Sequence, residues 1–403
     1  MKILYSAIDQ TVPGTKGGSV HVAAVAEGLA ALGHEVTALI TPGDSQPRLS
    51  PVRWVAMAPP FGSSHLRMAR AGAIEKLARG IGPDAIIERY HNFGGEALRS
   101  AAGVNAVAVL EVNAPVIDHA GSSKALVDRA LLIEPMRRWR ERLCALADVI
   151  VTPNAAILPP GIPAARVRVL EWGADTDRFR PDAGGKTPYA RLGVTTVAIF
   201  AGAFRSWHGA IHLVEAIKIL RARGVKSIGA VLVGDGSELH RVRQAAEGID
   251  TIVFTGALPH DRMPAALAGA DIGVAPFDVE AHAPLSLGFY WSPLKIFEYM
   301  AAGLPVVAPA VDRIPSLVAD GREGVLYDLP PDRLRQGFGG QEGGSHGEAL
   351  ADALVTLTDA SLRKTLGAAA RARAVGDYSW TAHCRALEAA ITDAQARRGK
   401  ADG

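Results

Sequence analysis

The chain has 403 residues, of which 48% are hydrophobic and 21% charged, with 43 basic residues against 41 acidic ones. This length exceeds what one ordinary core takes, so we expect two α/β domains. The formal net charge of +2 lacks the basic excess typical of nucleic-acid-binding proteins, and we expect no nucleic-acid partner. Cys144 and Cys384 have no metal-ligand spacing and are interpreted as buried thiols without a chemical role.

The first half of the chain alternates strand-like and helix-like segments. A first strand is expected at 2–7, followed by a helix over 19–32 that ends at Gly33. Further strands are expected at 35–40, 84–88, 107–111, 148–152 and 167–171. Such alternation predicts a parallel sheet with helices on both faces.

A second alternation follows Pro181, with strands expected at 196–201, 229–233, 251–254, 271–275 and 305–307. We therefore predict two Rossmann-like, doubly wound domains over 1–181 and 182–378. They are expected to face one another across a cleft at the carboxyl ends of their strands, where ligands bind in this architecture. A C-terminal helix and tail at 379–403 are expected to return to the first domain.

A glycine-rich segment at 335–345 interrupts two helical patterns. We interpret it as a flexible surface insertion in the second domain. The alternative, a phosphate-binding loop, is disfavoured because no clear strand precedes the segment and no Lys-Ser/Thr pair follows it.

The N-terminal apolar run is too short for a signal peptide, and no stretch is long enough to span a bilayer, so we expect a cytoplasmic protein. Two predicted helices carry basic residues beside apolar ones, a pattern compatible with peripheral contact with the inner membrane face. An ordinary solvated helix face is the favoured interpretation. The basic residues are Arg67, Arg70, Lys76 and Arg79 in the first helix, and Arg137, Arg138 and Arg140 in the second.

Two glycine loops precede helices in a way that suits anions. The first, at 13–19, contains Gly17 and Gly18, and the second, at 200–209, contains Arg205 and His208. Glycines let a backbone approach a ligand closely, and a helix N-terminus offers free N–H groups. A guanidinium and an imidazole beside such N–H groups suit a departing diphosphate. The alternatives are a plain turn, a surface cation and a helix-capping histidine.

Two further loops follow strands at 233–237 and 255–260 and contain Gly234 and Leu258. They are either the lining of one pocket or simple turns.

The segment 289–307 is more informative, since an aromatic loop leads to Ser292-Pro293, a good helix start. Glu298 lies about two turns into that helix, where a carboxylate can accept two ribose hydroxyls. A lone helical glutamate is otherwise expected to be exposed.

The run 292–303, with its Ser-Pro-Leu-Lys-x-x-Glu-Tyr-Met pattern, resembles the donor-site signature of the family-four retaining glycosyltransferases. Supporting similarities lie at 17–18, 32–36, 88–90, 110–115 and 173–181. The resemblance implies a B-type fold, with an acceptor-side first domain and a nucleotide-sugar donor-binding second domain. It implies hexose transfer from a nucleoside-diphosphate sugar to a hydroxyl of a glycan, glycolipid or small molecule. No cofactor and no metal are expected.

The resemblance also assigns roles. Glu298 would bind the donor ribose, Arg205 would contact the diphosphate, and His208 stands where the family commonly has a lysine. Gly17 and Gly18 would lie near the phosphates or the acceptor. The predicted catalytic residues are thus Arg205 and His208, and the predicted donor-binding residues are Gly17, Gly18, Gly234, Leu258, Tyr290, Trp291, Ser292, Pro293, Leu294 and Glu298.

Two positions depart from the family pattern. Tyr290 stands where the family usually has a first glutamate, and Glu111 and Asn113 lie where a histidine is often found. Two alternatives stay open. One is a sugar-nucleotide epimerase or hydrolase of similar architecture, and the other is a catalytically silent nucleotide-sugar-binding protein, which Tyr290 favours.

Overall fold

The computed structural model of the protein describes all residues except 15, 45–49, 120, 185–188, 330–344 and 402–403. The described chain forms two compact units. Unit 1 comprises Met1–Gly173, Tyr290–Ser292 and Trp380–Gly403, and unit 2 comprises Ala174–Phe289 and Pro293–Ser379. The prediction divided the chain after 181 and after 378. All of the predicted insertion except Ser345 lies outside the described residues.

Unit 1 is built on a parallel seven-stranded sheet of order β3-β2-β1-β4-β5-β6-β7. Buried apolar runs form its central strands, as both faces of a parallel sheet are covered. The strands are β1 (Lys2–Val12), β2 (Glu35–Pro42), β3 (Arg53–Ala56), β4 (Ala85–Arg89), β5 (Val107–Glu111), β6 (Val149–Thr152) and β7 (Val167–Val169).

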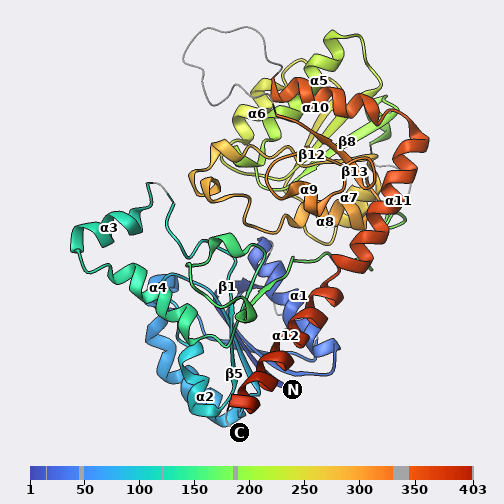
Figure 1. The fold of residues 1–403 in the computed structure, drawn as a ribbon. Helices are drawn as coiled ribbons and strands as arrows, with labels where there is room; N and C mark the ends of the chain where they lie inside the picture. Colours follow the sequence, from blue (N-terminus) through green and yellow to red (C-terminus); the bar gives the residue numbers. More distant parts are fainter. Residues whose placement is uncertain (15, 45–49, 120, 185–188, 330–344, 402–403) are drawn as a thin grey trace. The chain divides into compact units, whose positions relative to one another are not determined.

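The helices of unit 1 include one from the far end of the chain. They are α1 (Gly17–Ala31), α2 (Ala71–Ile81), α3 (Ser123–Leu131), α4 (Pro135–Leu146) and α12 (Trp380–Ala401). Helix α12 packs against α1, and Cys384, Leu387 and Ile391 of α12 are buried in the core of this unit (Figure 1). The predicted return of the C-terminal helix to the first domain is confirmed.

Unit 2 repeats the architecture with a parallel six-stranded sheet of order β10-β9-β8-β11-β12-β13. Its strands are β8 (Thr196–Ala201), β9 (Ile228–Val233), β10 (Ile252–Gly256), β11 (Ile272–Val274), β12 (Val306–Pro309) and β13 (Gly324–Tyr327). Its helices are α5 (Ala210–Ala222), α6 (Leu239–Ala245), α7 (Met263–Ala268), α8 (Leu294–Ala301), α9 (Ile314–Leu317), α10 (His346–Thr356) and α11 (Ala360–Asp377).

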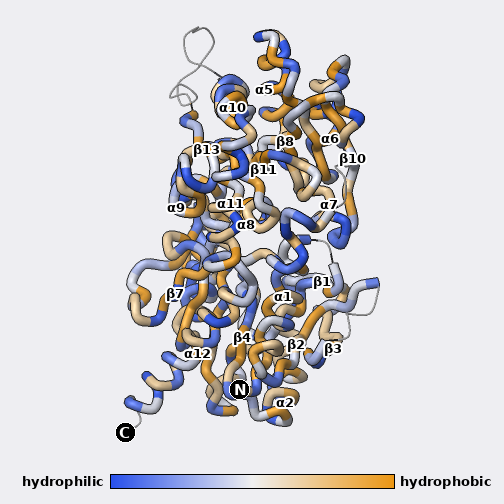
Figure 2. The backbone as a smooth tube through the Cα atoms, turned by 90° about the vertical axis from the view of Figure 1, so that its right-hand side faces the viewer, coloured by the Kyte–Doolittle hydropathy of each residue, from blue (hydrophilic) through white to orange (hydrophobic). Residues whose placement is uncertain are grey.

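Hydrophobic residues, orange in Figure 2, lie along strands of both sheets. In unit 2 all six residues of β8 and all six of β9 are buried. Helix α10 begins with a capping box between Ser345 and Glu348, which satisfies two N–H groups that a helix start would leave unpaired. The two doubly wound domains predicted from the alternation of strands and helices are confirmed.

Local details differ from the sequence-based expectations. The short strands β3 and β13 lie at the edges of their sheets and were not predicted, because neither is buried along its whole length. Helix α1 begins at Gly17, earlier than the predicted position 19. Pro293 is the N-cap of α8, with ψ of 81°, and does not occupy the first helical position that we expected. No described helix is both long and apolar enough to cross a membrane.

Candidate functional site

The strand order of unit 2 creates a switch point at its central strand. From β8 the chain runs to β9 and β10 on one side, then crosses to β11, β12 and β13 on the other. In open α/β sheets, the loops beyond the carboxyl ends of the strands diverge at this point and leave a crevice for a ligand. The candidate site of unit 2 therefore consists of the loops after β8, β9 and β10 and the start of α8.

Glycines allow these loops to pack backbone against backbone. Gly202 and Gly234 have φ of 146° and 133°, and a Cβ on Gly234 would overlap the carbonyl group of Gly202. The Gly202 N–H donates to the Val233 carbonyl, and the Gly234 N–H donates to the Gly256 carbonyl, both at 2.9 Å. Close approach that a side chain would prevent is what a phosphate-binding loop needs.

Arg205 and His208, the two predicted catalytic residues, both lie in the loop after β8. They differ in solvent exposure and in charge. Arg205 is exposed, and its guanidinium lies 5.3 Å from the ring centroid of Trp207. The Nδ1 atom of His208 lies 2.6 Å from the Ala203 carbonyl oxygen and donates to it. Burial, with help from the nearby charge of Lys295, lowers the pKa of His208 to about 3. His208 is thus a neutral ring at pH 7 and supplies no positive charge, unlike the lysine common in the family.

Lys295 in α8 was not among the predicted site residues. Its stem is partly exposed, but its Nζ atom is buried and has no hydrogen-bond partner. The ammonium lies 4.2 Å from the ring centroid of Phe200 and 5.3 Å from that of Phe277. The signal that could have found it is a lysine inside an otherwise apolar helix start.

Glu298 is only 9% exposed, which overturns the alternative of a solvated helical glutamate. Its Oε1 atom lies 3.3 Å from Nε2 of His260, in the loop after β10 that also holds the half-buried Leu258. Glu298 therefore lies beside the loop that holds Leu258. Leu294, the first residue of α8, is half-buried there.

The aromatic segment before α8 belongs to unit 1, so the predicted donor-binding set is divided between the units. The Oγ of Ser292 donates to Glu171 (2.6 Å) and accepts the Trp172 N–H (2.8 Å). Tyr290 is 8% exposed, and its ring is perpendicular to that of Trp291. The hydroxyl group of Ser292 is therefore already engaged within unit 1.

Gly17 and Gly18 are the first residues of α1, and Gly18 lies beside a polar cluster of unit 1. A Cβ on Gly18 would overlap the side chain of Gln10 and lie 3.5 Å from Arg89. Arg89 pairs with Glu111 at 2.9 Å. Glu111 also accepts from Tyr5 and Asn113, and Trp172 donates from its ring nitrogen to Asn113. This cluster at the carboxyl ends of β4 and β5 makes the two glycines part of a second candidate surface.

Buried histidine adds to this cluster. His21 is fully buried, with Nδ1 3.2 Å from Arg89 and 3.4 Å from Glu111, and its Nε2 has no partner. Burial, followed by the charge of Arg89, holds the pKa of His21 well below its usual value. A neutral imidazole nitrogen without a partner is a candidate contact for a ligand hydroxyl.

In the described part of the chain, His212, Asp278 and His346 of unit 2 are arranged closely enough to hold a metal ion. The two imidazole rings stack at 3.8 Å, and Tyr327 contacts Nε2 of His346 at 2.7 Å. His212 lies between Glu215 (2.9 Å) and Asp278 (3.3 Å). Although burial opposes it, these carboxylates raise the pKa of His212. Both ring nitrogens of His212 already contact these carboxylates, so the cluster is interpreted as a local network of hydrogen bonds and ion pairs.

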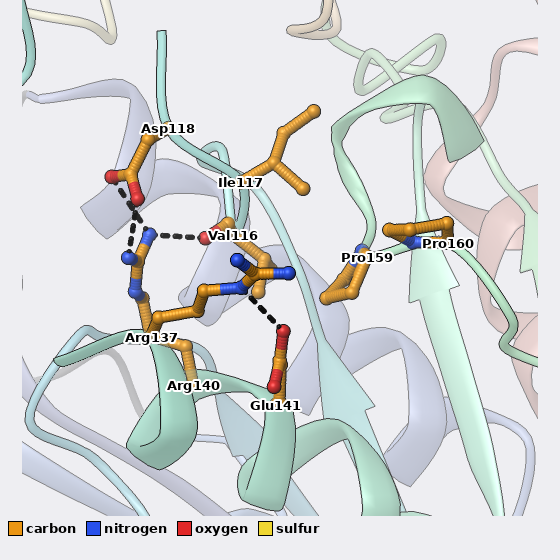
Figure 3. A pocket seen from close by; sticks show the side chains of 8 residues that line it. All are labelled: Val116, Ile117, Asp118, Arg137, Arg140, Glu141, Pro159 and Pro160. Carbon is orange, nitrogen blue, oxygen red and sulfur yellow. Dashed lines mark hydrogen bonds and ion pairs between the residues drawn. The ribbon is translucent and has the colours of Figure 1, made fainter. Parts of the chain in front are cut away.

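Helix α4 borders a cavity of about 230 Å³ in unit 1, opposite Pro159 and Pro160 (Figure 3). Arg140 points into the protein beside it, donates to the Val116 carbonyl and pairs with Asp118 at 2.7 Å. This arginine is 2% exposed, so it belongs neither to a membrane-facing surface nor to a solvated helix face, the two interpretations of the sequence.

Arg67 departs from that expectation in the same way. Its side chain has no exposed surface and pairs with Glu96 at 2.6 Å and with Asp9 at 3.2 Å. The expected basic helix face is therefore wrong at Arg67 and Arg140, because both guanidinium groups satisfy buried acceptors. Arg79, Arg137 and Arg138 are exposed.

The two sheets define a two-domain α/β protein of doubly wound type, and comparison with known proteins is more specific. Residues 15–178 match the family model "Glycosyltransferase Family 4", and residues 195–338 match "Glycosyl transferases group 1". A GDP-mannose-dependent α-(1-6)-phosphatidylinositol monomannoside mannosyltransferase of Mycobacterium tuberculosis is 30% identical over 54% of this chain and 54% of its own length. A GDP-mannose-dependent α-mannosyltransferase of the same species is 27% identical over 81% of this chain and 76% of its own length.

Solved structures share the whole fold at low identity. A sucrose-phosphate synthase from Thermosynechococcus elongatus has a TM-score of 0.70 at 18% identity, covering 100% of both chains. An Anabaena protein in complex with UDP has a TM-score of 0.65 at 17% identity, covering 97% of this chain and 100% of its own. Both halves of the chain are thus related to glycosyltransferases, and the predicted relationship is confirmed at that level. The chain spans about half the length of the first curated relative.

Proposed function

We propose that the protein is a retaining glycosyltransferase that moves a hexose from a nucleoside diphosphate to an acceptor hydroxyl. The observation that carries this proposal is the position of Glu298. A lone helical glutamate is normally solvated, whereas this one is 9% exposed near the glycine loops of unit 2. A carboxylate in such a place accepts ribose hydroxyls, and the adjacent loops offer backbone N–H groups to the phosphates.

In the proposed reaction, the bond between the sugar C1 and the diphosphate oxygen breaks, and its electron pair stays on that oxygen. The acceptor oxygen bonds to C1 from the same face, and its proton passes to the departing diphosphate. The protein then needs positioning and positive charge near the diphosphate more than a nucleophile. The exposed guanidinium of Arg205 is available for that task. No metal or cofactor is required by this scheme.

The named relatives favour GDP-mannose as the first donor to test, because the curated mannosyltransferases are GDP-mannose-dependent. The acceptor hydroxyl is proposed to belong to a glycan, a glycolipid or a small molecule. The proposal keeps Tyr290 as a determinant of donor choice, since it occupies the position of the family's usual first glutamate.

The test is a thermal-shift and calorimetric screen against UDP, GDP, ADP and their sugars, with and without magnesium. A ligand that binds the folded state raises the melting temperature. We expect one nucleotide to stabilise the wild type and the control variant Glu247→Gln, in which an exposed glutamate is changed. Glu298→Gln should lose most of that shift. Absence of any nucleotide shift in the wild type would contradict the proposal.

Turnover separates the proposal from its two rivals. A transferase consumes the donor only when an acceptor is present, whereas an epimerase or hydrolase rearranges or releases the donor by itself. A silent binding protein would bind the donor and turn over none across a broad acceptor panel. Donor consumption without acceptor would therefore favour the epimerase or hydrolase.

Peripheral membrane contact is proposed through the tip between α3 and α4. Leu131, Leu132 and Ile133 are 53%, 86% and 60% exposed, and the exposed Arg129 and Arg138 lie close in sequence. Apolar side chains with flanking arginines suit an anionic lipid surface. Wild-type protein should float with vesicles of phosphatidylglycerol and phosphatidylcholine at low salt, whereas a variant with all three residues changed to serine should not. Equal flotation of both would reject this surface.

A further inference from the structure

Lys295 presents a buried positive charge to the loop that follows β8. We propose that Lys295 binds the diphosphate of the donor and holds it as it leaves, the task for which His208 lacks a charge. This inference rests on the proposed function and specifies the cation that the same site uses. It follows from three separate features of the surroundings of Lys295.

The first feature is the missing partner. Among the described residues, no hydrogen-bond acceptor or carboxylate pairs with the Nζ atom of Lys295. The rings of Phe200 and Phe277 give the ammonium a weak cation–π contact only. A buried ammonium normally has a counter-charge or a full set of acceptors. An anionic ligand would supply both.

The second feature is the place of Lys295 in its helix. It is the second residue of α8, which begins at Leu294. The positive end of a helix dipole disfavours a cation in the first turn and attracts an anion. The backbone N–H groups of that turn and the Nζ atom therefore make the same region favourable for negative charge.

The third feature is access to the glycine loop. A Cβ added to Gly202 would lie 3.1 Å from Nζ of Lys295, so the ammonium lies directly against this glycine, where a side chain would crowd it. Arg205 lies in the same loop, three residues further along the chain. A diphosphate beside Gly202 would be within reach of Lys295 and close to the guanidinium of Arg205.

Binding of a diphosphate should also change the protonation of Lys295. Burial lowers the pKa of Lys295 to about 7, although the negative charge of Glu298 opposes the shift. A bound anion favours the charged form, so it raises the pKa again. At pH 8 the free protein would therefore take up a proton as the nucleotide binds. Glu298 and His208 are the other ionisable groups known to face Lys295.

The test compares GDP and UDP with guanosine, uridine and pyrophosphate by titration calorimetry on purified wild type, Lys295→Met and Lys295→Gln. Lys218→Met, which changes an exposed lysine of α5, is the matched control. We expect both Lys295 variants to bind the diphosphates about 10- to 100-fold more weakly, the effect of losing a hydrogen bond to a charged group. Nucleoside affinity should be unchanged in every variant.

Proton uptake gives a second readout that a packing role would not affect. Titrations at pH 8 in buffers of different ionisation enthalpy should show uptake on GDP or UDP binding by the wild type and by Lys218→Met. Both Lys295 variants should show none. Wild-type diphosphate affinity in both Lys295 variants would overturn this inference and leave the proposed function standing. A wild type that binds no nucleotide would overturn both.

Discussion

The two units each bury a cation, and the two differ in what surrounds it. In unit 1, Arg67 lies between Glu96 and Asp9, and its guanidinium makes hydrogen bonds to both. In unit 2, the Nζ atom of Lys295 has no such partner. A buried charge whose acceptors belong to its own domain holds that domain together. A buried charge without acceptors destabilises its domain. Such a charge has a function only where a bound ligand supplies the missing acceptors.

The largest expected effect is at the satisfied cation. Arg67→Met should lower the free energy of unfolding by about 3–5 kcal/mol, because Glu96 is left as a buried charge without its partner. Denaturant titration measures this effect. Arg79→Met, which removes an exposed ion pair with Glu75, should change stability little. Equal effects of the two substitutions would show that the buried ion pair contributes no more to stability than the exposed one.

Next in size is the opposite result at the unsatisfied cation. Lys295→Met should stabilise the ligand-free protein by about 1–4 kcal/mol at pH 6, because a side chain of similar length replaces a buried charge that no acceptor satisfies. Thermal or denaturant unfolding without nucleotide measures it. A clear loss of stability would mean that the ammonium has partners in the free protein, and the comparison with Arg67 would fail.

An effect of similar size concerns pH. The folded-state pKa of Lys295, about 7, lies below the value of about 10.4 in an unfolded chain. The unfolded state therefore binds more protons between these values, and this group makes stability rise with pH from about 7 to 10. The stability difference between Lys295→Met and the wild type should be greatest below pH 7 and vanish near pH 10. A difference that does not vary with pH would contradict the lowered pKa.

The smallest expected effect is at His208. His208→Gln should weaken nucleotide binding by about 1 kcal/mol or less, since an amide can replace the hydrogen bond of a neutral ring to the Ala203 carbonyl. The pH dependence of binding between pH 5 and 8 should be the same in His208→Gln as in the wild type. A large loss of affinity with a changed pH profile would show that His208 binds the diphosphate as a cation.

Much of this protein follows from sequence alone. The alternation of apolar strands and amphipathic helices predicted both doubly wound domains, because strand burial on two faces leaves long hydrophobic runs. Glycine before a helix marked the loops at 17–18, 202 and 234, and the structure has a close backbone approach between Gly202 and Gly234. Glu298 was identified from its place in a signature helix, and the structure shows it buried near the expected loops.

Other features depended on the tertiary structure. The sequence indicated surface positions for Arg67 and Arg140 and a diphosphate-binding role for His208, because residue type does not reveal desolvation. Burial and buried acceptors decided those states, and they depend on contacts between residues far apart in the chain, such as Arg67 with Glu96. Lys295 was part of a recognised motif, yet only the rings of Phe200 and Phe277 around its ammonium distinguish it from an ordinary helical lysine.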